Sequence, residues 1–173
     1  MTAETTQNKS VTLTEVFVGG PFFNLVDPQT GAMSEADQAK FSVLIEYFEN
    51  LGAKVHNAHR REAWGKEFLT ADEATLRDYT EIKASDIFVA YPGVPASPGT
   101  HVEIGWASAM GKPIILFLEK GEKHTFLITG LGTIADIEFI EFTDTADVMA
   151  QLEVAVAKVM SRATDKGAAD GAK

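Results

Sequence analysis

Five short strand-like segments alternate along this chain with longer segments of helical periodicity. The strand-like runs cover residues 15–19, 53–57, 86–91, 113–118 and 137–142. Helical patterns cover residues 34–50, 71–84, 100–111 and 145–163. Strands that alternate with helices form a parallel sheet, because each crossover helix returns the chain to the same edge. The pattern predicts an α/β fold: a three-layer sandwich in which a five-stranded parallel sheet carries helices on both faces.

Local signals support the helix assignments. Ser34 is a plausible N-cap, and Asp37 adds an acidic group to the first turn of the helix that follows. Thr70 and Glu73 have capping-box spacing, which predicts a helix start at about residue 71.

The length of 173 residues corresponds to about one domain, and 45% hydrophobic residues are enough for one core. We expect residues 15–163 to form this single domain. The polar, Thr-rich residues 1–14 are expected to be a flexible arm, and the Gly/Ala-rich residues 164–173 a disordered tail.

The formal net charge of −10 argues against nucleic-acid binding, because no basic patch is available to replace counterions. Cysteine is absent, which excludes disulfides and thiolate metal sites. The sequence has no apolar run of membrane-spanning length and no signal-peptide pattern at residues 1–9. We therefore expect a cytoplasmic protein without a membrane partner, a metal or another cofactor.

Ligands of open parallel sheets bind at the carboxyl ends of the strands. In this chain those ends lead into residues 19–20, 58–61, 91–99 and 119–125. Four loops from distant parts of the sequence are therefore expected to converge on one site.

The most informative of these loops leads into the helix expected at residues 100–111. Ser97, Gly99 and Thr100 form a small-residue turn between a strand and that helix, an arrangement that suits phosphate. Glu103 lies within the first turns of the same helix. A lone helical glutamate is most often a solvated residue, but a carboxylate next to a phosphate cradle suggests chemistry on a phosphorylated sugar.

Two aspartates lie near the third strand. Asp86 begins the strand, which is the wrong end for catalysis, so we expect a structural role. Asp78 lies in the preceding helix, which runs down from the carboxyl edge, and its side chain is either a site residue or a solvated charge.

Further candidates follow the first two strands. Glycine at position 19 would let a ligand approach the backbone, and Phe22 and Phe23 could stack on a nucleobase. His59 and Arg60 belong to a concentrated positive segment, whose alternative reading is a solvated loop. The candidate base- and sugar-binding residues are Phe17, Gly19, Phe22, Phe23, His59 and Arg60, although Phe17 also fits plain core. No G-x-G-x-x-G, Walker A, G-x-S-x-G or metal-ligand pattern occurs.

Four segments together resemble a known family: residues 16–22, 57–65, 85–90 and 95–107. They are similar to the nucleoside 2-deoxyribosyltransferase superfamily, and within it to the CMP and 5-hydroxymethyl-CMP hydrolases of mildiomycin- and blasticidin S-type antibiotic biosynthesis. The resemblance covers about residues 15–160. It implies a flavodoxin-like (Rossmann-like) domain, in agreement with the strand and helix pattern.

The resemblance also implies a reaction and roles for residues. CMP and water would give cytosine and ribose 5-phosphate. Glu103 matches the family's nucleophile, which attacks C1′ and forms a glycosyl-enzyme intermediate that water hydrolyses. Asp78 matches an aspartate that orients the nucleophile or handles protons at the base.

The family also suggests how the phosphate is bound. The transferases usually carry an acid six residues before the glutamate, where this chain has Ser97. A serine can donate to phosphate where an aspartate would repel it, so Ser97, Gly99 and the helix N-terminus favour a 5′-monophosphate. Related N-glycosidases complete the site with a hydroxyl of a second subunit, a place that Thr125 matches. A homodimer with shared active sites follows as a hypothesis.

The choice of base depends on one departure from the family. Hydroxymethyl-preferring relatives carry arginine where this chain has Phe23, which cannot donate to a hydroxymethyl oxygen, so we favour CMP over 5-hydroxymethyl-CMP. Two other functions stay open: a (deoxy)ribosyltransferase, against which Ser97 argues, and a non-catalytic nucleotide-binding protein, against which the presence of Glu103 argues.

Overall fold

A single parallel sheet forms the middle layer of the protein. The computed structural model describes residues 13–170, with side chains described up to residue 163. The strands of the sheet are β1 (Glu15–Gly19), β4 (Lys54–His56), β5 (Ile87–Ala90), β6 (Ile114–Glu119) and β7 (Ile137–Phe142). They pair in the order β4-β1-β5-β6-β7, and every pairing is parallel. Counted along the chain this is the order 2-1-3-4-5, so the predicted flavodoxin-like fold is confirmed.

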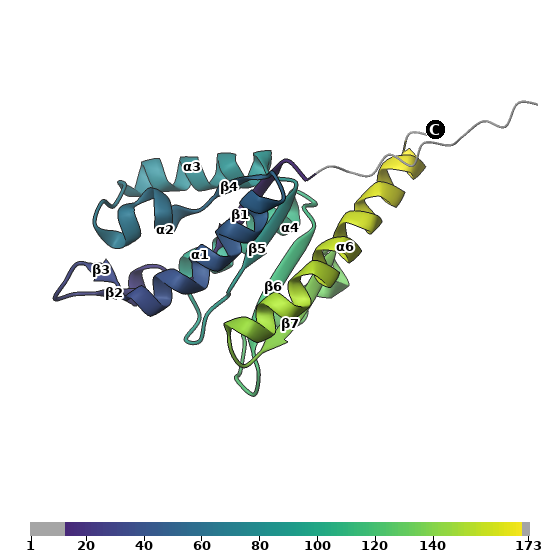
Figure 1. Ribbon diagram of the computed structural model, residues 1–173. Coiled ribbons are helices and arrows are strands. Elements are labelled where there is room, and N and C mark those ends of the chain that lie inside the picture. The colour runs from purple at the N-terminus through teal and green to yellow at the C-terminus, as the bar shows by residue number, and fades with distance from the viewer. Residues whose placement is uncertain (1–12, 171–173) are drawn as a thin grey trace, which may run out of the picture.

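Helices cover both faces of the sheet (Figure 1). They are α1 (Glu35–Asn50), α2 (Ala58–Arg61), α3 (Ala71–Ala84), α4 (Pro98–Ala109), α5 (Phe126–Thr129) and α6 (Thr145–Asp170). Short 3₁₀ turns occur at η1 (Phe23–Leu25), η2 (Ala63–Gly65) and η3 (Leu131–Thr133). The helix α6 runs through residues 164–170, which we expected to belong to the tail. The rest of the expected tail and residues 1–12 of the expected arm lie outside the described residues.

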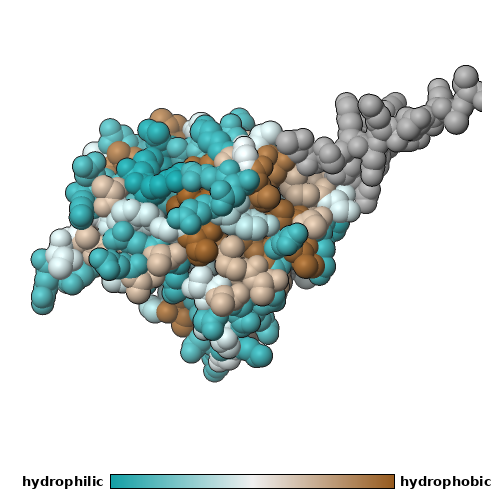
Figure 2. Space-filling view, in the orientation of Figure 1, coloured by the Kyte–Doolittle hydropathy of each residue, from teal (hydrophilic) through white to brown (hydrophobic). Residues whose placement is uncertain are grey.

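The alternation of side chains along each strand divides the core in two. On one face, Val16, Val18 and Val89 pack under α1 and α6. On the other face, Phe17 and Phe88 pack under α3 and α4. Because both faces are covered, the central strands β5 and β6 are almost wholly apolar and read as continuous runs, whereas the edge strands β4 and β7 include polar residues. A space-filling view shows mostly hydrophilic residues on the outside, with hydrophobic ones gathered near the middle of this side (Figure 2).

The helix starts follow the capping signals. The Ser34 hydroxyl accepts from the backbone N–H of Asp37, and Thr70 forms a complete capping box with Glu73. One connection carries structure that the sequence did not predict: residues 22–33 contain η1 and a small hairpin of β2 (Val26–Asp27) and β3 (Ala32–Met33).

At the amino edge of the sheet, Asp86 joins the starts of two strands through hydrogen bonds, as expected for a structural residue. Its Oδ2 accepts hydrogen bonds from Thr14 N (2.7 Å), Thr14 Oγ1 (2.8 Å) and Glu15 N (2.9 Å). Its own backbone N–H donates to the Glu15 carbonyl at 2.8 Å. The start of β5 is thereby fixed to the start of β1.

Candidate active site

A cavity of about 760 Å³ opens at the carboxyl edge of the sheet. Its walls come from the end of β1, the loop after it, α2, α3 and the first three turns of α4. Three of the four loops that we expected to converge therefore do so. The volume lies within the roughly 300–1,000 Å³ that small-molecule sites occupy.

Glu103 lies on the inner side of α4 at this cavity and is partly exposed to it. Its Oε2 is 3.0 Å from the position that a Cβ would take at Gly19, so a larger residue at the end of β1 would require the carboxylate to shift. Burial among protein atoms, and then the charge of Asp78, raise the pKa of Glu103 to about 8, against the opposing influence of Arg61. A carboxyl group of this kind is typical of reactive sites.

Asp78 faces the same cavity from α3. Its Oδ1 accepts from Nη2 of Arg61 at 2.8 Å. Burial raises the pKa of Asp78, Arg61 lowers it, and the neighbouring Glu81 and Glu62 raise it again, with a net upward shift. The structure thus brings together the two carboxylates that the sequence singled out.

The N-terminus of α4 forms one wall of the cavity, as expected for a phosphate cradle. Ser97 is the N-cap, and its Oγ accepts from Thr100 Oγ1 at 3.0 Å. Pro98 follows in the first turn, where the missing N–H costs nothing. Gly99 is exposed, and a Cβ there would meet nothing within 4 Å. The first-turn N–H groups and the helix dipole make this end suitable for an anion.

Aromatic side chains form the opposite wall. Phe22 and Phe23 both line the cavity, and Phe23 is 75% exposed. Phe68, which the sequence analysis did not single out, stacks on Phe23 with ring centroids 5.0 Å apart and also contacts Phe22 at 5.2 Å. Phe17 reaches the cavity floor but is only 1% exposed and stacks on Phe88 at 5.5 Å. Phe17 is therefore mainly a core residue, which was the alternative interpretation of its position in the first strand.

His59 lines the cavity as predicted, but its ring is fixed by the protein. Its Nε2 lies 2.9 Å from the Pro21 carbonyl, and its Nδ1 lies 3.1 Å from the Asn57 amide nitrogen. Its ring stacks on Phe41 with centroids 3.9 Å apart. Burial lowers the pKa of His59 to about 4, despite hydrogen bonds to the backbone that act in the other direction. A neutral His59 therefore donates to Pro21 and anchors the loop after β1.

The structure does not bring Arg60 to the cavity, contrary to our expectation. Its guanidinium donates to Glu49 at 2.8 Å and to the Val55 carbonyl at 3.3 Å. Arg61 points the other way and binds Asp78. Successive residues of a helix such as α2 point about 100° apart, so the two adjacent arginines contact different partners. The sequence pattern led us to predict Arg60 as a site residue, whereas its neighbour Arg61 is the one that contacts Asp78.

Thr125 does not line the cavity of its own chain. Its hydroxyl lies 3.0 Å from Nε2 of His101, whose Nδ1 lies 2.7 Å from the Ser97 carbonyl. The loop at residues 119–125, the fourth that we expected to converge, is thus joined to the start of α4 from outside the cavity. Among the described residues, no cluster of His, Asp or Glu could hold a metal ion.

Comparisons with known proteins agree with this geometry. The family model for nucleoside 2-deoxyribosyltransferases matches residues 20–149. Among solved structures, BlsM is 52% identical, with a TM-score of 0.77 over 88% of this chain and 94% of BlsM. The CMP N-glycosidase BcmB of Clostridium botulinum is 38% identical, with a TM-score of 0.65 over 82% of this chain and 98% of BcmB.

More distant similarity extends to a conserved protein of Enterococcus faecalis V583, at 19% identity and a TM-score of 0.53, which supports the fold alone. No protein of established function matched in the curated comparison. Within residues 13–170, no helix has both the length and the apolar character required to cross a bilayer.

Proposed function

The chain belongs to the nucleoside 2-deoxyribosyltransferase family, and from this membership we propose that it is a nucleotide N-glycosidase that hydrolyses CMP to cytosine and ribose 5-phosphate. The observation that carries the proposal is the position of Glu103. Its carboxyl group lies against Gly19 in a cavity that also holds a second carboxylate, Asp78, and a helix N-terminus. One cavity therefore offers a nucleophile, a proton-handling group and a phosphate cradle.

In the first step an oxygen of Glu103 attacks C1′ as the bond from C1′ to N1 of cytosine breaks. The bonding electrons leave with the base, which takes up a proton, and a glycosyl-enzyme ester forms. Water then attacks C1′, releases the Glu103 carboxylate and loses a proton to give ribose 5-phosphate. The transition states carry positive charge on the sugar, so an ionised Glu103 stabilises them before and during bond formation.

The substrate's phosphate is assigned to the first turn of α4. The protein carries a net charge of −10, so a dianion must be held by local donors. Ser97 and the backbone at Gly99 supply them at the cavity wall, together with the helix dipole. Because phosphate would lie at the start of α4 and C1′ beside Glu103, the sugar would extend along the first two turns of the helix.

The aromatic wall is assigned to the base. Phe22 and Phe23 would stack on cytosine, an interaction worth roughly 1–3 kcal/mol per base in other proteins. Phe23 offers no hydrogen-bond donor to a 5-hydroxymethyl group, which favours CMP. Replacing Phe23 with Arg and comparing kcat/KM for CMP and 5-hydroxymethyl-CMP tests this choice, and an unchanged ratio would remove it.

We further propose a homodimer in which Thr125 completes the phosphate site of the partner. In its own chain Thr125 lies outside the cavity, yet it is hydrogen-bonded to His101 at the start of α4. Phe126 and Leu127, which follow it, are 94% and 86% exposed, as expected of side chains that a second subunit covers. A chain that is monomeric at the concentrations where it is active would contradict this arrangement.

The experiment that tests the function is a panel of ribo- and deoxyribonucleoside monophosphates, together with the matching nucleosides, scored by the base released. We expect release of cytosine from CMP and little release from cytidine. Cleavage of cytidine at the same kcat/KM would contradict the phosphate assignment. Absence of any cleavage by a folded, dimeric protein would overturn the proposal.

The family model favours one other activity, transfer of the sugar to a second base. Both activities share the glycosyl-enzyme intermediate and differ only in whether water or a base accepts the sugar. Incubation with CMP and an excess of a second free base distinguishes them, because transfer produces a new nucleotide and hydrolysis produces none.

A further inference from the structure

We propose that Arg61 is a positioning residue for this site: its guanidinium fixes Asp78 beside Glu103 and supplies positive charge to the carboxylates that surround it. The inference rests on the proposed function, because it assigns to Arg61 a part in the work of Asp78 and Glu103. The arginine itself does not line the cavity.

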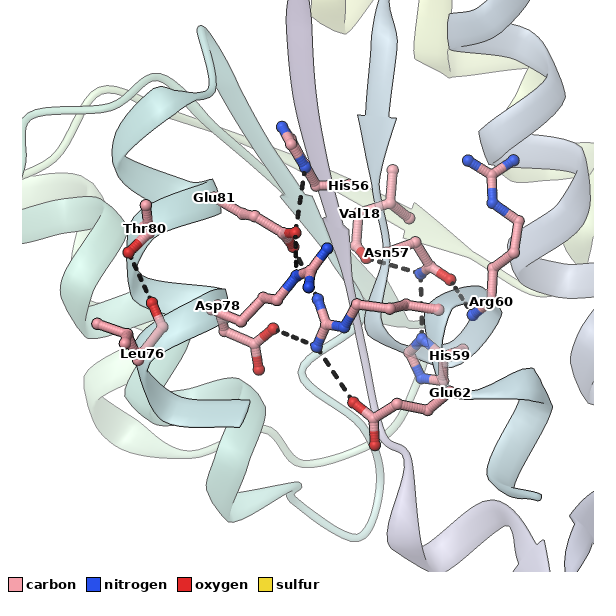
Figure 3. A network of polar contacts seen from close by, with 12 residues as sticks. Val18, His56, Asn57, His59, Arg60, Glu62, Leu76, Asp78, Thr80 and Glu81 are labelled. Carbon is pink, nitrogen blue, oxygen red and sulfur yellow. Dashed lines mark hydrogen bonds and ion pairs between the residues drawn. The ribbon is translucent and has the colours of Figure 1, made fainter. Parts of the chain in front are cut away.

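Arg61 donates hydrogen bonds to three carboxylates, those of Asp78, Glu62 and Glu81, which are labelled in Figure 3. Its Nη2 donates to Asp78 Oδ1 at 2.8 Å and to Glu62 Oε1 at 3.1 Å. Its Nη1 donates to Glu81 Oε2 at 2.7 Å. The Arg61 side chain is 15% exposed, and those of Asp78, Glu62 and Glu81 are 13%, 6% and 14% exposed. We call these four residues the arginine cluster.

The arrangement leaves Asp78 available to a substrate. Only Oδ1 is engaged by Arg61, and within the described part of the chain Oδ2 has no hydrogen-bond partner. The guanidinium thus sets the orientation of the carboxylate from behind and leaves an oxygen toward the cavity that Asp78 lines. An arginine suits this task because its planar fork can bind several carboxylates at once, which the point charge of a lysine does less well.

The arginine cluster carries more negative than positive charge. One guanidinium faces three carboxylates, and Glu103 lies within electrostatic reach of both Arg61 and Asp78. Arg61 favours the ionised form of Glu103, whereas Asp78 disfavours it. Loss of the guanidinium charge would therefore make ionisation of Glu103 harder, and loss of a neighbouring carboxylate would make it easier.

Glu81 connects the arginine cluster to a second group of charges, which lies along β4, β1 and α3. Its Oε1 accepts from Arg77 Nε at 3.1 Å and lies 3.5 Å from His56 Nδ1. The other ring nitrogen of His56 lies 2.6 Å from Glu15 Oε2, which is itself 3.6 Å from Lys54 Nζ. Glu81 thus separates two arginines: Arg61 on the side of the site, and Arg77, which is 58% exposed, on the outer side.

This arrangement provides a matched set of variants: R61K, R61Q, E81Q and R77Q. The measurement is kcat/KM for CMP from pH 5 to pH 10. In R61Q we expect the midpoint of the acidic limb to rise by about one pH unit, with a loss of about 10-fold at pH 7 that shrinks toward pH 10. R61K should keep part of the activity, because it keeps the charge but not the fork.

E81Q should shift the midpoint of the acidic limb in the opposite direction. It removes a negative charge from the arginine cluster, which makes ionisation of Glu103 easier, so the midpoint should fall. R77Q removes an arginine from the same glutamate on the outer side and should leave the midpoint unchanged. A purely structural role for Arg61 would reduce stability in R61Q and E81Q without moving the midpoint in either, and that result overturns the proposal.

Two provisions keep the result decisive. If R61Q fails to fold, E81Q still distinguishes an electrostatic role of Arg61 from a structural one, because only the electrostatic role predicts a lowered midpoint. The titration of the Glu103 carboxyl carbon, followed by ¹³C NMR in the resting protein, reports the same shifts without any turnover. If the wild-type protein cleaved no nucleotide while the NMR midpoints moved as expected, the proposed function would fail and the role of Arg61 would stand. Unmoved NMR midpoints would overturn it.

Discussion

The two edges of the sheet hold carboxylates in opposite ways. At the amino edge, Asp86 accepts three hydrogen bonds through one oxygen. Burial acts to raise its pKa, but the N–H groups of Glu15 and Thr14 and the Thr14 hydroxyl outweigh it, and the net shift is downward. At the carboxyl edge, Glu103 is surrounded by protein and by the charge of Asp78, and its pKa rises to about 8.

Hydrogen-bond donors make the difference between these two carboxylates. Where the backbone directs N–H groups at a carboxylate, the ionised form is stabilised and holds two strands together. Where no donors are directed at it, the ionised form is costly and the group stays reactive. Stability and reactivity are therefore located at opposite ends of the same strands.

Replacing Glu103 with Gln is the most severe test of this contrast. The substitution keeps the size of the side chain but removes the nucleophile, so kcat for CMP hydrolysis should fall by roughly 10³-fold or more. Binding of CMP should remain measurable by calorimetry. If the variant retained turnover, that result would contradict the assignment of Glu103 as the nucleophile.

The pH dependence of the wild-type enzyme should reveal the raised pKa of Glu103. Because the nucleophile must be ionised, kcat/KM should rise as the pH rises through about 8 and then level off. Between pH 6 and pH 8 the increase expected for one proton is about 50-fold. A profile already flat at pH 6 would mean that the ionised form is not disfavoured in the free enzyme.

At the other edge, Asp86→Asn should affect stability and leave catalysis unchanged. The folded-state pKa of Asp86 is depressed, so its contribution is present above the unfolded pKa of about 3.9 and is lost as the pH falls through the folded value. At pH 7 we expect a loss of about 1–3 kcal/mol in urea unfolding, which should shrink below pH 4. Unchanged kcat/KM is the internal control, and a large loss of activity would contradict a purely structural role.

The smallest effect expected is a gain in stability in Glu103→Gln. The folded-state pKa of Glu103 is raised, so ionisation destabilises the fold increasingly from the unfolded pKa of about 4.3 up to about 8. The variant should equal the wild type near pH 4 and exceed it by about 1–2 kcal/mol at pH 8, a figure reduced for the partial exposure of the side chain. The pH trends of these two stability measurements should therefore have opposite signs.

Much of the fold could be predicted from the sequence because both sheet faces are buried. Strands such as Glu15–Gly19 and Ile114–Glu119 read as continuous apolar runs, and the caps Ser34 and Thr70 mark helix starts. The hairpin at Val26–Asp27 and Ala32–Met33 escaped prediction, because strands of two residues leave no periodicity to detect.

The candidate site could be predicted where position in the fold decided the matter, and less well where orientation did. Ser97, Gly99 and Glu103 follow from a strand end and a helix start, whereas Asp78 lies in mid-helix and was assigned through the family resemblance; the structure brings all four to one cavity. The difference between Arg60 and Arg61 depends on the phase of a four-residue helix, which is too short to show an apolar stripe. Phe68 is in contact with Phe23 only through the folded loop, so no sequence pattern could reveal it.

The approach of Glu103 Oε2 to Gly19 reverses the usual ranking of substitutions. Alanine is ordinarily the mildest replacement for a glycine whose φ is negative, and here it would add one methyl group at the place the carboxylate needs. A change that adds no charge, removes no hydrogen bond and leaves the backbone unstrained would still displace the reactive group. The small size of the residue at position 19 therefore matters for the placement of the reactive carboxylate and not for the fold, so an alanine there should reduce activity while the protein stays folded.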